Sequence, residues 1–266
     1  MQKAAHANLI YVPAGDRSLH PEWLEGPCPP NFDLAVNYYG PTTDKWRPTA
    51  TFYQHSPGAM KFPAAADWLE EHWSLVSQYE YVALPDDDVS AGAHDWGAVF
   101  DLVRQFGLDL AQPSLTAECY WSHPITVQQA GCLARYTNFV EPMVPVFSLA
   151  ALERCLPTFK MSSSGFGLDW VWPKLLLPAG MALGVIDAVA FVHTRSVTSG
   201  QASNSQDRTA QANNRHHPAL WDEIFVKELF GLQVTPDPTT YSAVYPPGRP
   251  PAAPSGAPAV GVPSCA

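Results

Sequence analysis

Three consecutive carboxylates, Asp86, Asp87 and Asp88, follow the apolar run Tyr81–Leu84 and a proline. In an extended backbone, side chains two residues apart lie on the same face, so Asp86 and Asp88 are expected to converge while Asp87 points away. Converging carboxylates repel each other unless a cation neutralises them, and a hard divalent cation with oxygen ligands does so. The pattern predicts a metal site at the end of a strand. The alternative is a solvated acidic turn that caps the next helix.

A further carboxylate, Asp169, follows a turn of serines and glycines at residues 162–167 and begins an aromatic, apolar segment. There it is either part of a site or the N-cap of a helix. The turn is not a dinucleotide-binding loop, because Trp170 stands where the third glycine would be, and the chain contains neither G-x-x-x-x-G-K-[ST] nor G-x-S-x-G. Kinase-like, dinucleotide-binding and serine-hydrolase functions therefore lose support.

A histidine, His193, ends the strand-like run Gly184–Val192. An imidazole at the end of a strand is a candidate metal ligand, although a lone histidine is more often structural. The H-E-x-x-H arrangement of zinc proteases is absent. Both roles remain open on the residues alone.

The elements that must position these residues alternate along the chain. Short runs of β-branched and aromatic residues, typical of buried strands, are Asn8–Val12, Asp33–Tyr39, Ala50–Tyr53 and Tyr81–Leu84. Apolar residues repeat at helical spacing over Ala65–Val76, Trp96–Phe106 and Leu220–Leu229. The alternation predicts an α/β domain with a mainly parallel sheet, flanked by helices, whose ligands bind at the carboxyl ends of the strands.

Composition and charge exclude several functions. Of the 266 residues 46% are hydrophobic, which is typical of a packed domain, and 25 Asp and Glu against 15 Lys and Arg give a net charge of −10. A nucleic-acid partner or an anionic membrane surface would oppose that charge. No run approaches the roughly 20 apolar residues of a membrane-spanning helix. Five scattered cysteines and no signal-like N-terminus predict a cytoplasmic protein.

The C-terminal composition predicts where the domain ends. Pro, Ala, Gly and Ser dominate the end of the chain and leave few large apolar side chains. We therefore expect one domain over residues 1–235 and a disordered tail over residues 236–266. The polar stretch of residues 199–217 is expected to be a mobile loop.

Taken in order, these blocks resemble the domain-of-unknown-function family 707, which is related to GT-A glycosyltransferases. The resemblance extends from about Asn8 to Phe230. The blocks that carry it are Val12–His20, Asn37–Gly40, Gly58–Phe62, Leu84–Asp88, Tyr120–His123, Arg135–Pro145, Gly165–Asp169 and Gly184–Asp187 with His193.

The resemblance implies a metal-dependent, inverting glycosyltransferase that moves a sugar from a nucleotide-diphosphate donor to a hydroxyl acceptor, such as a glycan. It places Mn²⁺ or Mg²⁺ on Asp86, Asp88 and His193, and makes Asp169 the general base. The donor-binding residues would be Gly15, Asp16, Asn37, Tyr39, Lys61 and Asp87, with Lys61 on the diphosphate and the first four near the base. Trp121, Trp170 and Trp172 are either an acceptor platform or core residues.

Two alternatives stay open beside this function. One is a non-catalytic sugar- or sugar-nucleotide-binding module, and the other is a metal-dependent phosphohydrolase. Turnover of a sugar nucleotide only in the presence of an acceptor separates them, because the binding module gives no turnover and the hydrolase needs only water.

Overall fold

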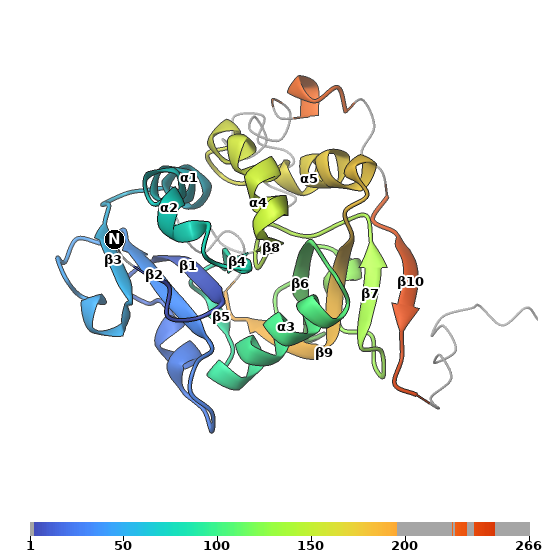
Figure 1. The fold of residues 1–266 in the computed structure, drawn as a ribbon, viewed down its shortest axis with the longest axis horizontal. Helices are drawn as coiled ribbons and strands as arrows, with labels where there is room; N and C mark the ends of the chain where they lie inside the picture. Colours follow the sequence, from blue (N-terminus) through green and yellow to red (C-terminus); the bar gives the residue numbers. More distant parts are fainter. Residues whose placement is uncertain (1–2, 196–224, 226, 233–236, 248–266) are drawn as a thin grey trace, which may run out of the picture.

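One sheet runs through the computed structural model, which describes residues 3–195, 225, 227–232 and 237–247 (Figure 1). The strands lie in the order β10 (Thr240–Val244), β7 (Ala134–Thr137), β9 (Leu183–His193), β6 (Leu110–Leu115), β8 (Val146–Ser148), β4 (Tyr81–Ala83), β1 (Asn8–Ala14), β2 (Phe32–Tyr38) and β3 (Phe52–His55), and β5 (Val89–Ser90) pairs with β9. Along that order, only β7 and β8 run against the other strands. The predicted α/β class with a mainly parallel sheet is confirmed.

Helices cover both faces of the sheet (Figure 1). On one face lie α1 (Lys61–Glu71), α2 (Trp73–Val76), α4 (Leu149–Cys155) and α5 (Leu168–Leu176), and on the other lies α3 (Ala93–Gln105). Short 3-10 helices span His20–Leu24, Arg47–Thr49, Pro124–Thr126, Leu156–Met161 and Leu177–Ala179. No helix among the described residues is long and apolar enough to cross a membrane.

The alternation of side chains along β1 explains the two cores. Leu9 and Tyr11 pack with the α1 and α5 side, whereas Ile10 and Val12 pack with α3. Both sets are fully buried, because a strand covered by helices on both faces has no solvated side. This explains why the strands read as continuous apolar runs in the sequence.

Most of the predicted elements are present with shifted ends. The helix expected over Ala65–Val76 is divided at His72, whose backbone (φ −105°, ψ 21°) leaves the helical region. The strand expected from Ala50 begins at Phe52. Most of the helix expected over Leu220–Leu229 lies outside the described residues.

A buried ion pair anchors the irregular strand β9. Its pairing with β6 shifts register between Pro113 and Ser114, so that β9 carries extra residues there. The carboxylate of Asp187, in this bulge, accepts bonds from Arg135 Nε at 2.7 Å and Nη2 at 2.9 Å, and from the backbone N–H of Gln129 at 2.8 Å. These bonds satisfy a carboxylate that is otherwise costly to bury.

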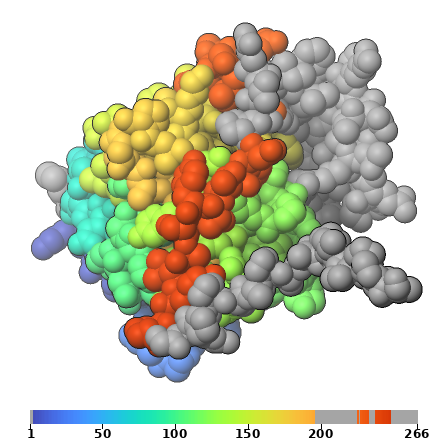
Figure 2. All heavy atoms as spheres, turned by 90° about the vertical axis from the view of Figure 1, so that its right-hand side faces the viewer, coloured from blue at the N-terminus to red at the C-terminus, as the bar shows by residue number. Residues whose placement is uncertain are grey.

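The predicted tail is wrong for its first part. Residues 240–244 form β10, which pairs antiparallel with β7, and Leu133 donates a backbone hydrogen bond to the carbonyl of Val244 at 2.7 Å. Figure 2 shows the described segment 237–247, in orange-red, on the surface of the molecule. The edge of a sheet stabilises a strand through backbone hydrogen bonds, which need no large apolar side chains. Residues 248–266 lie outside the described residues.

Removal of β10 tests its contribution to stability. A chain that ends at Thr239 is expected to melt about 4–8 °C below a chain that ends at Pro247. The hydrogen bonds of β10 contribute about 1 kcal/mol each at most, so we expect a net loss of about 2 kcal/mol, and at about 2–4 °C per kcal/mol this loss produces the difference. Thermal unfolding followed by circular dichroism measures it. Equal melting temperatures would show that β10 adds nothing to the stability of the sheet.

Candidate functional site

The carboxyl ends of four strands bring the predicted site residues to one edge of the sheet. Gly15 and Asp16 follow β1, Tyr39 follows β2, and the acidic run follows β4. His193 is the last residue of β9, which runs parallel to these strands. Ligands of open α/β sheets bind at this edge.

Asp86, Asp88 and His193 form a group that fits a divalent cation. One potential ligand atom from each of them lies within 4.8 Å of the others, and His193 Nε2 is 3.3 Å from Asp88 Oδ1. Ligand atoms of one octahedral ion at about 2.1 Å from the metal lie about 3 Å apart, so small movements are enough to close the group around it. Carboxylates suit hard divalent cations and imidazole is a common ligand of transition metals, so the three side chains together are compatible with a divalent metal.

The other ring nitrogen of His193 fixes its orientation. Nδ1 donates to the carbonyl oxygen of Tyr120 at 2.8 Å, which leaves Nε2 to face Asp88. Although burial opposes the change, the hydrogen bond and the charge of Asp88 raise the pKa of His193 above its usual 6.5. A carbonyl on the non-ligating nitrogen is the usual support of a metal-binding histidine.

Lys61 holds Asp86 in place. At the start of α1, its ammonium donates to Asp86 Oδ1 at 2.6 Å and to the carbonyls of Pro142 and Met143 at 2.6 and 3.1 Å. Burial raises the pKa of the Asp86 carboxyl, and the charge of Lys61 opposes that shift. The backbone N–H of Asp86 also donates to Met143, at 2.8 Å. Asp86 is thus attached to two other segments.

Asp87 points away from the other two carboxylates, as predicted. Its Oδ2 accepts the backbone N–H of Gly15 at 2.7 Å and the hydroxyl of Tyr39 at 3.3 Å, and its Oδ1 accepts a bond from Arg195 at 3.3 Å. Burial raises the pKa of Asp87, and the hydrogen bond from Gly15 opposes the shift.

These contacts surround a cavity of about 170 Å³. It is lined by Gly15, Asp16, Arg17, Tyr39, Asp87 and Arg195. The backbone of Gly15 approaches the ring of Tyr39 closely, because a Cβ at this position would lie 2.5 Å from the hydroxyl. Asp87 and Arg195 belong to the cavity and also adjoin the metal group, so one ligand can reach both.

Asn37, predicted to bind the donor, lies elsewhere, and Trp172, for which a platform and a core role were both open, is a core residue. Asn37 is buried on β2, donates to the hydroxyl of Tyr11 at 2.9 Å, and does not line the cavity. Trp172 is fully buried in the core against Phe62 and is therefore no acceptor platform, whereas Trp121 is exposed. Alternation of β2 side chains between the two faces of the sheet directs Asn37 inward.

Asp169 lies in the first turn of α5 and is not its N-cap. The N-cap is Gly167, in the left-handed region at φ 90°. The Asp169 carboxylate is nearly buried and lies 4.0 Å from His123 Nε2. The segment that carries His123 also carries Tyr120, whose carbonyl holds His193. This short segment connects Asp169 to the metal group.

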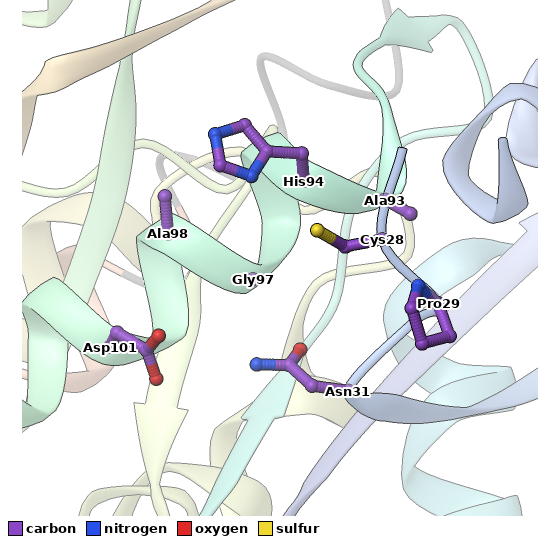
Figure 3. Close-up of a pocket in the computed structure, with 8 residues that line it drawn as sticks. All are labelled: Cys28, Pro29, Asn31, Ala93, His94, Gly97, Ala98 and Asp101. Carbon is purple, nitrogen blue, oxygen red and sulfur yellow. The ribbon is translucent and has the colours of Figure 1, made fainter. Parts of the chain in front are cut away.

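A larger cavity of about 300 Å³ lies at the opposite edge of the sheet. Figure 3 shows Cys28, Pro29 and Asn31 on one wall and residues of α3, including His94 and Asp101, on the other. Asn31 precedes β2, so this cavity lies at the amino ends of the parallel strands. Among the described residues, the potential metal ligands converge only at Asp86, Asp88 and His193.

Sequence reasoning missed Arg195, which touches both carboxylates beside the cavity. Its Nη2 lies 3.3 Å from Asp87 Oδ1, and its Nε lies 3.4 Å from Asp88 Oδ2. The sequence could have indicated Arg195, because it follows His193 by two residues, and residues two apart share a face in extended backbone.

The chain matches no family model and no curated protein. Solved structures with a similar arrangement include S. aureus TarS 1–349, with a TM-score of 0.48 and 10% identity over 84% of this chain and 70% of that chain. The same fragment in complex with UDP-GlcNAc has a TM-score of 0.48 and 12% identity, over 84% and 71% of the two chains. Similarity at this level carries no argument about activity, and membership of family 707 stays a prediction.

Proposed function

We propose that this protein is a metal-dependent GT-A-type glycosyltransferase that moves a sugar from a nucleotide-diphosphate donor to a hydroxyl acceptor with inversion. The observation that carries the proposal is the convergence of Asp86, Asp88 and His193 beside the cavity of Gly15, Tyr39 and Asp87. A metal group alone serves many reactions. A metal group beside a polar cavity suits a ligand that has phosphate groups, which would meet the ion, and an uncharged part, which would lie in the cavity.

The protein's own residues prepare the donor side of the reaction. Lys61 holds Asp86, and the Tyr120 carbonyl holds His193, so that both ligands are oriented before any ion binds. A divalent cation bound there would stabilise the negative charge that develops on the diphosphate as the glycosyl bond breaks. The ring of Tyr39, which lines the cavity, offers an aromatic surface to the uncharged part of the donor.

Asp169 is the proposed base on the acceptor side. A single carboxylate that removes the proton of the attacking hydroxyl, opposite the leaving group, produces inversion. The near-burial of Asp169 keeps bulk water away from the carboxylate, and the contact with His123 holds it beside the segment that supports the metal group. The exposed aromatic rings of Tyr120 and Trp121 on that segment offer a surface for an acceptor sugar.

A thermal-shift screen of UDP, GDP, ADP and their sugar nucleotides, with and without Mn²⁺, tests the proposal. A ligand at about 100 times its dissociation constant stabilises the folded protein by about 2.7 kcal/mol, which raises the melting temperature by about 5–11 °C. We expect such a shift for one nucleotide, only with the metal present. No metal-dependent shift with any of them would contradict the proposal.

Turnover then separates the three candidate functions. A glycosyltransferase releases the nucleoside diphosphate much faster when a hydroxyl acceptor is present. Cleavage of the sugar nucleotide that needs only water, whichever phosphate products it gives, would indicate a phosphohydrolase, and binding without cleavage under all conditions would indicate a binding module.

A further inference from the structure

The ammonium of Lys61 has no N–H group left for a phosphate. An ammonium group has three N–H donors, and in the structure they serve Asp86, Pro142 and Met143 at 2.6, 2.6 and 3.1 Å. The side chain is 14% exposed. A phosphate that bound Lys61 would have to displace one of these acceptors and leave it unpaired in a buried place.

Arg195 is held far more loosely. A single nitrogen, Nη2, lies 3.3 Å from the Asp87 carboxylate and from the carbonyls of Asp87 and Arg17. A guanidinium has five N–H donors, and no described residue accepts a bond from Nη1. Contacts of 3.3–3.4 Å are at the long end for such bonds, which are usually 2.7–2.9 Å when both groups are charged. The guanidinium therefore has donors to offer a ligand.

The charges around Arg195 favour an anion once a divalent ion is bound. Three carboxylates, Asp86 to Asp88, face two cations, Lys61 and Arg195, which leaves one net negative charge. A divalent ion on Asp86 and Asp88 would change the net charge of this group from −1 to +1. The same ion would attract the Asp88 carboxylate, which is one of the groups that now engage Arg195.

We propose that Arg195 is the cation that binds the donor diphosphate, and that Lys61 is a positioning residue for Asp86 without contact to the donor. The inference rests on the proposed function and replaces the predicted role of Lys61. Arg195 lines the cavity and touches Asp88, so it stands where a metal-bound phosphate meets the cavity. Its planar fork suits two phosphate oxygens at once.

The test uses Arg195→Gln and Lys61→Met with inorganic pyrophosphate, the part common to all nucleotide-sugar donors, in the presence of saturating Mg²⁺. Calorimetry should show that Arg195→Gln binds pyrophosphate about 10–100-fold more weakly than the parent, the loss expected for charged hydrogen bonds. Arg195→Lys keeps the charge but lacks the planar fork, so its affinity for pyrophosphate should lie between that of the parent and that of Arg195→Gln. Lys61→Met is measured at a Mg²⁺ concentration that saturates this variant. Its affinity for pyrophosphate should then stay within about threefold of that of the parent.

Arg17→Gln is the matched control, because Arg17 is an exposed arginine on the same cavity. It should bind pyrophosphate within about threefold of the parent, and Mg²⁺ alone should bind Arg195→Gln no more weakly than the parent. Equal affinities of parent and Arg195→Gln, or a loss confined to Lys61→Met or Arg17→Gln, would overturn the inference and leave the proposed function standing. A parent that binds neither pyrophosphate nor any of UDP, GDP and ADP with metal would refute both.

Discussion

The Asp86→Asn and Asp88→Asn variants are expected to bind Mn²⁺ at least about 100-fold more weakly than the parent. Loss of an outer-shell partner alone typically weakens metal binding 10–100-fold, and these two carboxylates are direct ligands in the proposed site. An amide keeps the size of the side chain but removes the charge that a hard cation needs. Calorimetric titration of Mn²⁺ measures the loss, and circular dichroism confirms the fold.

Asp87→Asn is the matched control for that titration. Asp87 belongs to the same acidic run, but its carboxylate faces Gly15, Tyr39 and Arg195. A charge that does not touch the ion acts only through a screened field, so we expect a loss of less than about tenfold. Equal losses at all three positions would mean that the run attracts cations by its total charge, without a defined site.

The second large effect concerns turnover. The Asp169→Asn variant is expected to transfer sugar about 10²–10⁴-fold more slowly than the parent while its donor affinity stays unchanged, because an amide cannot take a proton from the acceptor hydroxyl. Its free energy of unfolding should fall by no more than about 1 kcal/mol, the worth of a charge in the first turn of a helix. Initial rates, donor titration and urea unfolding measure the three quantities.

Asp95→Asn provides the structural comparison. Asp95 lies in the first turn of α3, where its carboxylate accepts the backbone N–H of Gly92 at 2.8 Å. It should show a similar loss of stability and no loss of turnover. If Asp169→Asn works within a few-fold of the parent, Asp169 is not the base and Glu141 becomes the next candidate. Asp187 does not qualify, because Arg135 and Gln129 already bind its carboxylate.

Local rules were enough to predict several features of the site. The alternation rule predicted that Asp87 is separated from Asp86 and Asp88, and the observed partners of the three carboxylates agree, although Asp87 and Asp88 lie in a turn between β4 and β5. The apolar runs before Gly15 and before the acidic run form β1 and β4. Parallel neighbours end at the same edge, so the place of the cavity followed from the α/β pattern.

Local rules failed where a side chain finds a partner that is distant in the sequence. Asn37 stands next to the site in the chain, yet its side chain turns inward to Tyr11. Lys61 has the right charge for a phosphate, but the carbonyls of Pro142 and Met143 occupy it. Composition described the end of the chain as a tail, because it carries no information about the free hydrogen-bonding groups at the edge of β7 that bind β10.

The sequence by itself determined the α/β alternation, the carboxylates at the end of β4 and the separation of Asp87 from its neighbours. Each depends on residues close together in the chain. The tertiary structure alone decided that His193 meets Asp88, because the antiparallel pairing of Val89 with His193 sets the register between β5 and β9. The tertiary structure also decided which cationic side chain has all its N–H donors bonded within the protein. Lys61 and Arg195 both lie at carboxylates, and only the packing of distant segments leaves one of them with donors for a ligand.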